Sequence, residues 1–284
     1  MQKNVVIIGA PRSGTNMLRD VLTRLSGVST WPCDEINYIW RHGNVRYPSD
    51  EFTPEMARPE VREYVQRHFR WVAERYQAHT VVEKTCANSL RVGFVDHVVP
   101  QARYIFIRRD GLDAVGSAMK RWAAPLDFSY VLEKVRFVPV TDLPYYGVRY
   151  LWSRLYRLFS AENRLAFWGP RIEDMPALLA RYSLEEVCAL QWKRCVDSAF
   201  GTLSGMSKDR WLEICYEDFV QEPDLELARI MDWLDLHAQP TEVREALAGV
   251  SDSSIGKGRM QLGSEVTERL LPLIQDTQNQ FGYG

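Results

Sequence analysis

The stretch that decides the fold is Val5-Val6-Ile7-Ile8-Gly9-Ala10-Pro11-Arg12-Ser13-Gly14-Thr15-Asn16. Its four leading apolar residues predict a short strand that is buried on both faces, as in a parallel sheet covered by helices. Two glycines and a proline then predict a tight loop. The apolar residues that follow recur at helical spacing (Met17, Leu18, Val21, Leu22 and Leu25). A strand, a glycine-bearing loop and a helix in this order form a cradle whose backbone N–H groups point at an anion.

The residue types in the loop narrow down which anion it suits. The loop of nucleotide triphosphatases reads G-x-x-x-x-G-K-[ST], in which the Lys reaches the outer phosphates and the hydroxyl residue binds Mg²⁺. Gly9 and Gly14 have that spacing, but Thr15 replaces the Lys, Asn16 replaces the Mg²⁺ ligand, and the cation of the loop is Arg12. The loop therefore suits one anionic centre without a metal. A metal-dependent phosphotransferase of the same fold and a turn that binds nothing are the weaker alternatives.

The segment Pro11-Arg12-Ser13-Gly14-Thr15 resembles the 5′-phosphosulfate loop of sulfotransferases, which use 3′-phosphoadenosine 5′-phosphosulfate (PAPS) as donor. The Arg-Ser-Gly-Thr form is similar to that of tyrosylprotein sulfotransferases and related bacterial enzymes. The resemblance implies that the donor is bound by Pro11, Arg12, Ser13, Gly14, Thr15 and Asn16. It also implies that Arg12 stabilises the charge that builds up during transfer.

A second nucleotide-binding pair follows another predicted strand, the apolar run from Ala102 to Arg108. Arg109 stands at the end of this strand, and Ser117 lies eight residues later, about two turns inside the next predicted helix. The 3′-phosphate motif of sulfotransferases has this Arg, this Ser and this separation. An Arg offers a fork to two phosphate oxygens and a Ser offers a hydroxyl donor. Arg108 is the alternative to Arg109.

Candidate catalytic residues stand near the first predicted helix and at the end of a predicted strand, Val81 to Thr85. Ligands in open parallel sheets gather outside the carboxyl ends of the strands, where Lys84 falls. The resemblance implies that Lys84 is a catalytic cation and that Glu35 is the general base, with Asp34 as the adjacent alternative. The family pattern resembles Glu-Lys-Thr-Pro-x-Asn, but this chain has Cys86 in place of the Pro.

Further contacts to the nucleotide are implied in the last third of the chain. The predicted strand from Trp211 to Tyr216 ends in a Tyr that lines the nucleotide pocket in the resembled family. Bacterial sulfotransferases similarly carry a loop with Gly and Lys or Arg, which here contains Lys257 and Arg259 and is followed by a predicted helix from Ser264 to Phe281. The resemblance implies that both cations contact the 3′-phosphate.

Composition restricts the class of protein. The chain has 284 residues and a net charge of −2, so we expect a single α/β domain over residues 1–284 and no nucleic-acid partner, which would require a basic surface. Its five cysteines are scattered without a C-x-x-C pair, which indicates reduced thiols in a cytoplasmic protein and no metal site. We expect no signal peptide, no amino-terminal anchor and no transmembrane segment, because no apolar run approaches the necessary length.

Residues 122–183 resemble no known motif and interrupt the alternation of strands and helices, which predicts a helical insertion. Between Tyr145 and Arg181 the chain has six arginines, no lysines and three acids, together with several aromatic residues. Aromatic faces and arginines suit a sugar ring or an anionic acceptor. The alternative is an insertion with a small core of its own.

Together these observations predict a three-layer α/β fold with a P-loop-like parallel sheet. The resemblance implies a sulfotransferase that moves a sulfuryl group from PAPS to an acceptor hydroxyl, which we expect on a saccharide or glycolipid. A catalytically silent nucleotide-binding protein is the alternative from another class, and it would leave Glu35 without a catalytic task.

Overall fold

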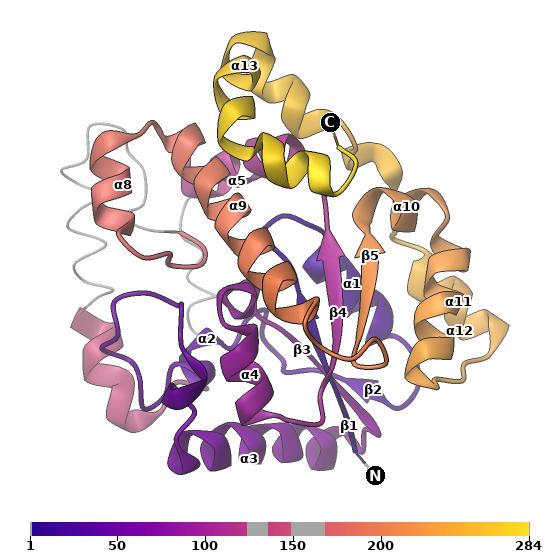
Figure 1. Ribbon diagram of the computed structural model, residues 1–284. Helices are drawn as coiled ribbons and strands as arrows, with labels where there is room; N and C mark the ends of the chain where they lie inside the picture. The colour runs from indigo at the N-terminus through magenta and orange to yellow at the C-terminus, as the bar shows by residue number, and fades with distance from the viewer. Residues whose placement is uncertain (1, 124–135, 149–167, 284) are drawn as a thin grey trace.

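The computed structural model describes residues 2–123, 136–148 and 168–283, and its framework is a parallel five-stranded sheet (Figure 1). The strand order is β2-β3-β1-β4-β5, and all four neighbouring pairs are parallel. The strands are β1 (Lys3–Ile8), β2 (Val28–Ser29), β3 (Thr80–Lys84), β4 (Arg103–Arg108) and β5 (Trp211–Cys215). The predicted α/β class with a P-loop-like parallel sheet is confirmed.

Helices cover both faces of this sheet because the strand residues alternate between two hydrophobic cores. Val6 and Ile8 of β1 belong to one core, and Val5 and Ile7 belong to the other. The first core contains residues of α3 (Pro59–Tyr76), α4 (Val92–Val98), α5 (Gly111–Ala123), α9 (Leu184–Leu203) and α13 (Lys257–Gln280). The second contains residues of α1 (Thr15–Leu22), α10 (Tyr216–Gln221), α11 (Pro223–Leu234) and α12 (Pro240–Leu247). In Figure 1, α4 and α9 cross in front of the sheet and α1 lies behind it.

Short helical segments lie between these elements. They are α2 (Asn37–Trp40), α8 (Met175–Arg181), and the 3₁₀ turns η1 (Pro54–Met56), η2 (Cys86–Leu90), η3 (Val140–Asp142) and η4 (Asp252–Ser254). Residues 143–148 are helical as well.

The strand order places the expected ligand-binding crevice at the carboxyl ends of the central strands. β1 has β3 on one side and β4 on the other, and β3 is reached from β1 through the edge strand β2. The chain therefore places β2 and β3 on one side of β1 and then crosses to place β4 and β5 on the other side. In parallel sheets, ligands bind at the point where the strand order changes direction in this way. Ile7 of β1 stands opposite both Lys84, the last residue of β3, and Ile105 of β4. The loops after β1 and β3 therefore begin within one residue of the same level, and β4 extends three residues beyond Ile105, to Arg108.

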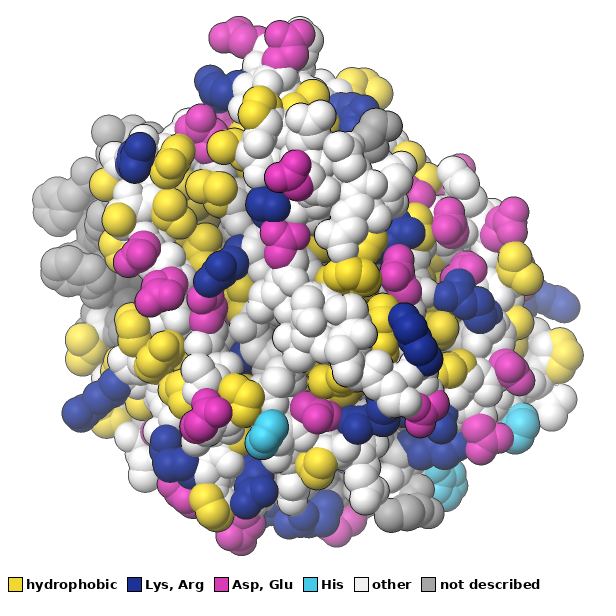
Figure 2. Space-filling view, in the orientation of Figure 1, with side chains coloured by type: hydrophobic (Ala, Val, Ile, Leu, Met, Phe, Trp, Pro, Cys, Tyr) yellow, Lys and Arg dark blue, Asp and Glu magenta, His cyan; other side chains and the backbone are white. Residues whose placement is uncertain are grey.

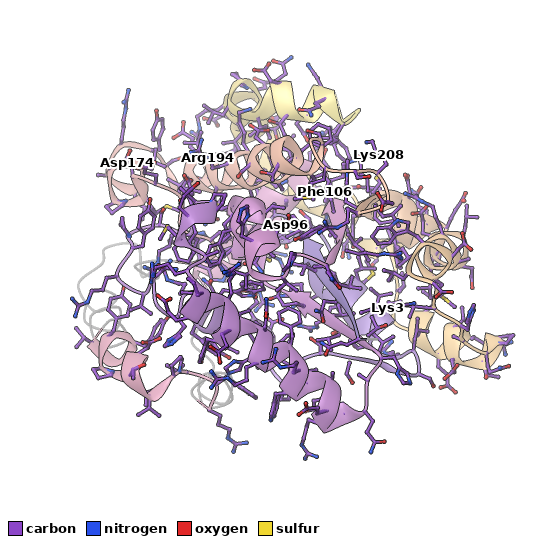
Figure 3. All side chains as sticks on the ribbon, turned by 60° about the horizontal axis from the view of Figure 1, so that its bottom comes forward. Lys3, Asp96, Phe106, Asp174, Arg194 and Lys208 are labelled. Atoms are coloured by element: carbon purple, nitrogen blue, oxygen red, sulfur yellow. The ribbon has the colours of Figure 1, made fainter. Side chains whose placement is uncertain are left out.

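Polar contacts at the other edge of the sheet fix the amino ends of the strands. The Lys3 ammonium lies 2.9 Å from the Asp235 carboxylate, just after α11. Asp96 of α4 accepts hydrogen bonds from the Tyr104 hydroxyl at 3.0 Å and from Arg210 at 2.6 Å. Figure 3 brings this edge forward and shows Lys3 beside the helices that follow β5 and Asp96 near the middle of the molecule. These contacts hold the edge of the sheet that faces away from the crevice.

Several boundaries differ from the sequence prediction. β2 was not predicted, because its two residues are too short to show a period. The spacing of Val61, Val65, Phe69 and Val72 predicts a helix over 53–76, but α3 begins at Pro59, whose ring suits the first turn, and η1 precedes it. The strand expected to end at Tyr216 ends one residue earlier, and Tyr216 begins α10. The last helix begins at Lys257 instead of Ser264, with a break at Gly263.

Half of the predicted insertion at 122–183 falls outside the described residues, so the prediction of a single domain with an insertion stays a prediction. Within the described ranges, no helix has both the length and the hydropathy to cross a membrane. On the face shown in Figure 2, basic and acidic side chains are interspersed, in keeping with the net charge of −2.

Two glycines allow a matched stability test. Gly14 has a φ of 88°, and a Cβ there would lie 2.3 Å from the Tyr216 ring, whereas Gly201 in α9 has open space around it. Gly14→Ala is therefore expected to lower the free energy of unfolding by at least about 1 kcal/mol, and Gly201→Ala to leave it unchanged or raise it by up to about 1 kcal/mol. Urea unfolding of both variants measures this. Equal stabilities would contradict the tight packing of the loop against Tyr216.

Candidate active site

The loop between β1 and α1 has an unusual backbone. Arg12 and Gly14 both lie in the left-handed region, with φ of 70° and 88°. The Ser13 N–H donates to the Ala10 carbonyl at 3.2 Å, which closes a tight turn. Left-handed residues next to ordinary ones are how a chain forms a concave backbone nest for an anion. A left-handed arginine is strained, so its conformation points to a constraint at this loop.

Donors in and after the loop are available for an anion. α1 has no side-chain cap and no acid in its first turn, so its first N–H groups lack a side-chain acceptor. The Ser13 hydroxyl is buried and has no hydrogen-bond partner among the described residues. A phosphate in the cradle would satisfy donors of both kinds. The loop therefore fits a phosphate group.

Arg109 and the loop are in direct contact, and Arg109 also meets the carboxyl-terminal part of the chain. Its guanidinium donates to the Arg12 carbonyl at 3.0 Å and to the Ser254 carbonyl at 2.7 Å. It lies 4.4 Å from the centre of the Tyr216 ring. The Nε atom is buried without a partner in the described chain. Arg108 instead points at Glu213, 2.6 Å away, so of the two arginines Arg109 is the one that lies at the loop.

Ser117 and Arg12 complete the same cluster. The Arg12 Nε donates to the Ser117 hydroxyl at 2.9 Å, although the two residues were predicted to bind different phosphates. Burial lowers the pKa of Arg12, and the nearby positive charges of Arg121 and Arg109 lower it further. Three cations so close together create a positive potential. An anion bound between them would relieve their mutual repulsion.

Lys84 brings the two candidate bases together. Its ammonium is buried and lies 3.1 Å from Oδ1 of Asp34 and 3.1 Å from Oε1 of Glu35. Arg19 of α1 binds the same Asp34 oxygen at 2.7 Å. The side chains of Asp34 and Glu35 are about equally accessible, at 29% and 27%. Both carboxylates therefore lie at the rim of the crevice, above a buried cation.

The two carboxylates differ in their electrostatic surroundings. Burial would by itself raise the pKa of Asp34, but the Lys84 charge and the hydrogen bond from Arg19 outweigh it and hold the pKa well below its usual range. Burial would lower the pKa of Lys84, but the neighbouring groups Glu35, Cys86 and Asp34 together outweigh burial and raise it. Lys84 is therefore a permanent cation, and Asp34 is a carboxylate with little affinity for a proton.

The turn after β3, which has Cys86 in place of the proline of the resembled pattern, is held to residues 35 and 36 by hydrogen bonds. The Cys86 N–H donates to Oε1 of Glu35 at 3.3 Å, and the Thr85 hydroxyl accepts from the Ile36 N–H at 3.2 Å. The Cys86 thiol lies 3.6 Å from the Thr15 hydroxyl. Burial, together with the charge of Glu35, raises the pKa of this thiol. The backbone N–H that a proline would lack thus holds the candidate base.

A buried polar network supports this turn from below. Asn88 donates to the Glu83 carboxylate at 2.9 Å and accepts from Arg91 at 2.9 Å. Arg91 also donates to Asn37 at 2.6 Å, two residues after Glu35. Residues 83–91 therefore hold the segment that carries both candidate bases by side-chain as well as backbone contacts.

The remaining predicted contacts lie at the rim. Arg259 is exposed and pairs with Asp110 at 3.0 Å, and Lys257 is exposed at the start of α13. Tyr216 is buried under Arg109. The structure thus brings together one group of predicted residues at the end of β4 and the first loop: Arg12, Ser117, Arg109 and Tyr216. It also brings Lys84 together with Glu35. Lys257 and Arg259 stay at the edge.

Two residues of the site were not predicted from the sequence. Arg19 stands four residues after Thr15 in α1, and Asp113 stands four residues after Arg109. Side chains four residues apart on a helix share a face, so this spacing was the available signal. Because a charge at such a position is usually solvated, the spacing alone did not single them out.

The comparisons with known proteins agree with this geometry. A family model described as "Sulfotransferase family" matches residues 4–167. No curated protein matches the chain. Among solved structures, the sulfotransferase domain from the curacin biosynthetic pathway is similar at 14% identity and a TM-score of 0.56, covering 97% of this chain and 98% of that one.

Two further structures are similar over nearly the whole chain. The sulfotransferase domain of the Synechococcus PCC 7002 olefin synthase has 14% identity and a TM-score of 0.55, covering 96% of this chain and 95% of that one. Sulfotransferase STF9 from Mycobacterium avium has 14% identity and a TM-score of 0.57, covering 98% of this chain and 76% of that one. At this level of identity the similarity supports the fold.

The pH dependence of the free energy of unfolding tests whether Glu83 is buried in this network. Burial raises the pKa of this carboxyl to about 7, although hydrogen bonds and nearby cations partly oppose the shift. Because the folded-state pKa of Glu83 is raised, its contribution to the free energy of unfolding is fully present below about pH 4.3, the pKa of Glu in an unfolded chain. This contribution is lost as the pH rises through 7. The free energy of unfolding of the wild type, relative to Glu83→Gln, should therefore fall across this window.

Chemical unfolding at several pH values measures the difference. Glu245→Gln, on the exposed face of α12, is the matched control and should follow the wild type. A Glu83→Gln variant whose stability runs parallel to that of the wild type would contradict a protonated, buried Glu83.

Proposed function

The chain belongs to the sulfotransferase family, and we propose that its donor is PAPS and that the sulfuryl group is transferred to an acceptor hydroxyl. The observation that carries this proposal is the cluster of Arg12, Ser117 and Arg109 where β1 and β4 end. Two features at this cluster favour a phosphorylated ligand: the positive charges of Arg12, Arg109 and nearby Arg121, and buried donors without partners among the described residues.

We assign the donor-binding residues as follows. When bound, PAPS supplies an activated sulfuryl group and a bisphosphate leaving group. The loop Gly9–Asn16 and the first turn of α1 would hold the 5′ end through backbone N–H groups. Arg109 and Ser117 would hold the 3′-phosphate, and the Tyr216 ring supports Arg109 from below. Lys257 and Arg259 are exposed near this end and would add charge at the rim.

Glu35 is the better of the two candidate bases. Asp34 is fixed by Arg19 and Lys84 through one oxygen, and its pKa lies well below the usual range, so it takes up a proton poorly. Glu35 contacts Lys84 and the Cys86 N–H and lies at the same rim. In transfer, the acceptor oxygen bonds to sulfur, the sulfur–phosphate oxygen bond breaks, and Glu35 takes the hydroxyl proton.

Lys84 and Arg12 have the complementary task. Negative charge builds up on the leaving oxygen as its bond to sulfur breaks, and preorganised cations that face this charge lower the barrier. Lys84 is buried and permanently charged, and Arg12 is fixed by Ser117, so neither requires reorganisation during the step.

For the acceptor we propose a saccharide or a glycolipid. The support is the composition of the stretch between Tyr145 and Arg181, which has six arginines and several aromatic residues. Most of these arginines lie outside the described residues. The test is incubation with radiolabelled PAPS and a panel of glycans, glycolipids and peptides. Label transferred only to peptides would overturn the acceptor class without affecting the donor.

The roles of Glu35 and Arg109 separate in a two-variant experiment. Glu35→Gln is expected to lose about 10²- to 10⁴-fold in kcat while it binds 3′-phosphoadenosine 5′-phosphate (PAP) as the wild type does, because the base faces the acceptor. Arg109→Ala is expected to weaken PAP binding, because a charge-assisted contact to phosphate is lost. Calorimetry and turnover assays measure both.

Arg244→Ala, an exposed change on α12, is the control and should alter neither quantity. Full turnover in Glu35→Gln would assign the proton to another carboxylate. Unchanged PAP affinity in Arg109→Ala would remove Arg109 from the nucleotide site.

A further inference from the structure

The carboxylate of Asp113 has an unusual set of partners. Asp113 lies on α5, and its side chain accepts hydrogen bonds from three backbone N–H groups at the start of α13: Gly256 at 2.6 Å, Gly258 at 2.9 Å and Arg259 at 3.0 Å. It is 2% exposed. A residue more than 140 positions earlier in the chain therefore caps the first turn of this helix.

The backbones of α5 and α13 touch at this point. A Cβ on Gly116 would lie 2.3 Å from the Gly258 carbonyl oxygen, and a Cβ on Gly258 would lie 2.2 Å from the carbonyl oxygen of Asp113. Only glycine permits such an approach at either position. The Asp113 carboxylate and the two glycines thus define one docking contact between the helices.

The two oxygens of the Asp113 carboxylate have different hydrogen-bond partners. Oδ1 binds the N–H groups of Gly258 and Arg259, whereas Oδ2 binds Gly256 and also lies 3.4 Å from the Arg109 guanidinium. Arg109 in turn donates to Ser254, in the turn just before Gly256. One buried carboxylate therefore joins the carboxyl-terminal loop to the arginine assigned to the 3′-phosphate.

We propose that Asp113 is a positioning residue for the 3′-phosphate end of the donor. It holds the loop 253–259 closed against α5 and fixes the orientation of Arg109, and so places Lys257 and Arg259 at the rim. The nucleotide part of this proposal rests on the proposed function; the closure of the loop does not.

A carboxylate commonly stabilises the N-terminus of a helix, and here the carboxylate comes from a distant segment of the chain. The first N–H groups of a helix carry partial positive charge, and a carboxylate there forms charge-assisted hydrogen bonds. Without Asp113 these buried N–H groups would lack an acceptor, and the loop would be free to leave α5. Arg109 would also lose the anion that faces it from the first turn of α5.

The first test measures loop closure without nucleotide. Asp113→Asn keeps one side-chain oxygen but removes the charge and one acceptor. Hydrogen exchange of the amides in 256–262 is expected to become about tenfold faster, while the amides of β4 keep their wild-type protection. Asp252→Asn, an exposed change at the start of η4 and one residue before this loop, is the matched control and should exchange as the wild type does.

The second test measures the nucleotide. Asp113→Asn is expected to bind PAP about tenfold more weakly and AMP as the wild type does, with an unchanged kcat at saturating PAPS. Gly258→Ala disturbs the same contact from the other side and should reproduce this pattern, which covers the case that Asp113→Asn does not fold.

The outcomes are distinguishable. Unchanged exchange in 256–262, or equal losses of PAP and AMP affinity, would overturn the role of Asp113. A wild-type chain that binds PAP no better than AMP would overturn the donor assignment and the nucleotide part of this proposal, while the exchange result would still decide loop closure.

Discussion

The guanidinium of Arg109 is the point at which separate parts of the chain meet. It bonds to the carbonyl of Arg12 in the first loop and to the carbonyl of Ser254 in the carboxyl-terminal loop, and it stacks on Tyr216 at the start of α10. Arg suits this position because its donors form a rigid planar fork and its charge persists when buried. The anion cradle after β1 and the loop before α13 therefore share one structural support.

A second cation organises the other half of the crevice. Lys84 is buried at the end of β3 and draws Asp34 and Glu35 to itself, and Arg19 then neutralises the first of them. A buried charge requires such partners, because an unpaired ammonium would be costly to desolvate. Asp34 thus has two cationic partners, Lys84 and Arg19, and its pKa lies well below its usual range, whereas Glu35 contacts the Lys84 ammonium.

Sequence patterns predicted the parts of the fold and site that depend on local order. The buried run Val5–Ile8 and the loop after it are local signals, and strand ends in a parallel sheet converge, so Lys84 and Arg109 were expected at one edge. The contact between Arg12 and Ser117 could not be predicted, because it depends on how α5 lies against the first loop. Asp113 was missed for the same reason: its partners are backbone N–H groups more than 140 residues away. The edge strand β2 was missed because two residues carry no periodicity.

The central claim is that one crevice at the carboxyl ends of β1, β3 and β4 binds the bisphosphate of PAPS. The most direct measurement is a crystal structure of the complex with PAP. We expect the 5′-phosphate in the loop Gly9–Asn16 near Lys84 and the 3′-phosphate at Arg109 and Ser117. A nucleotide bound elsewhere, for example between α11 and α12 where Asp224, Met231 and His237 line a separate cavity of about 310 Å³, would contradict it.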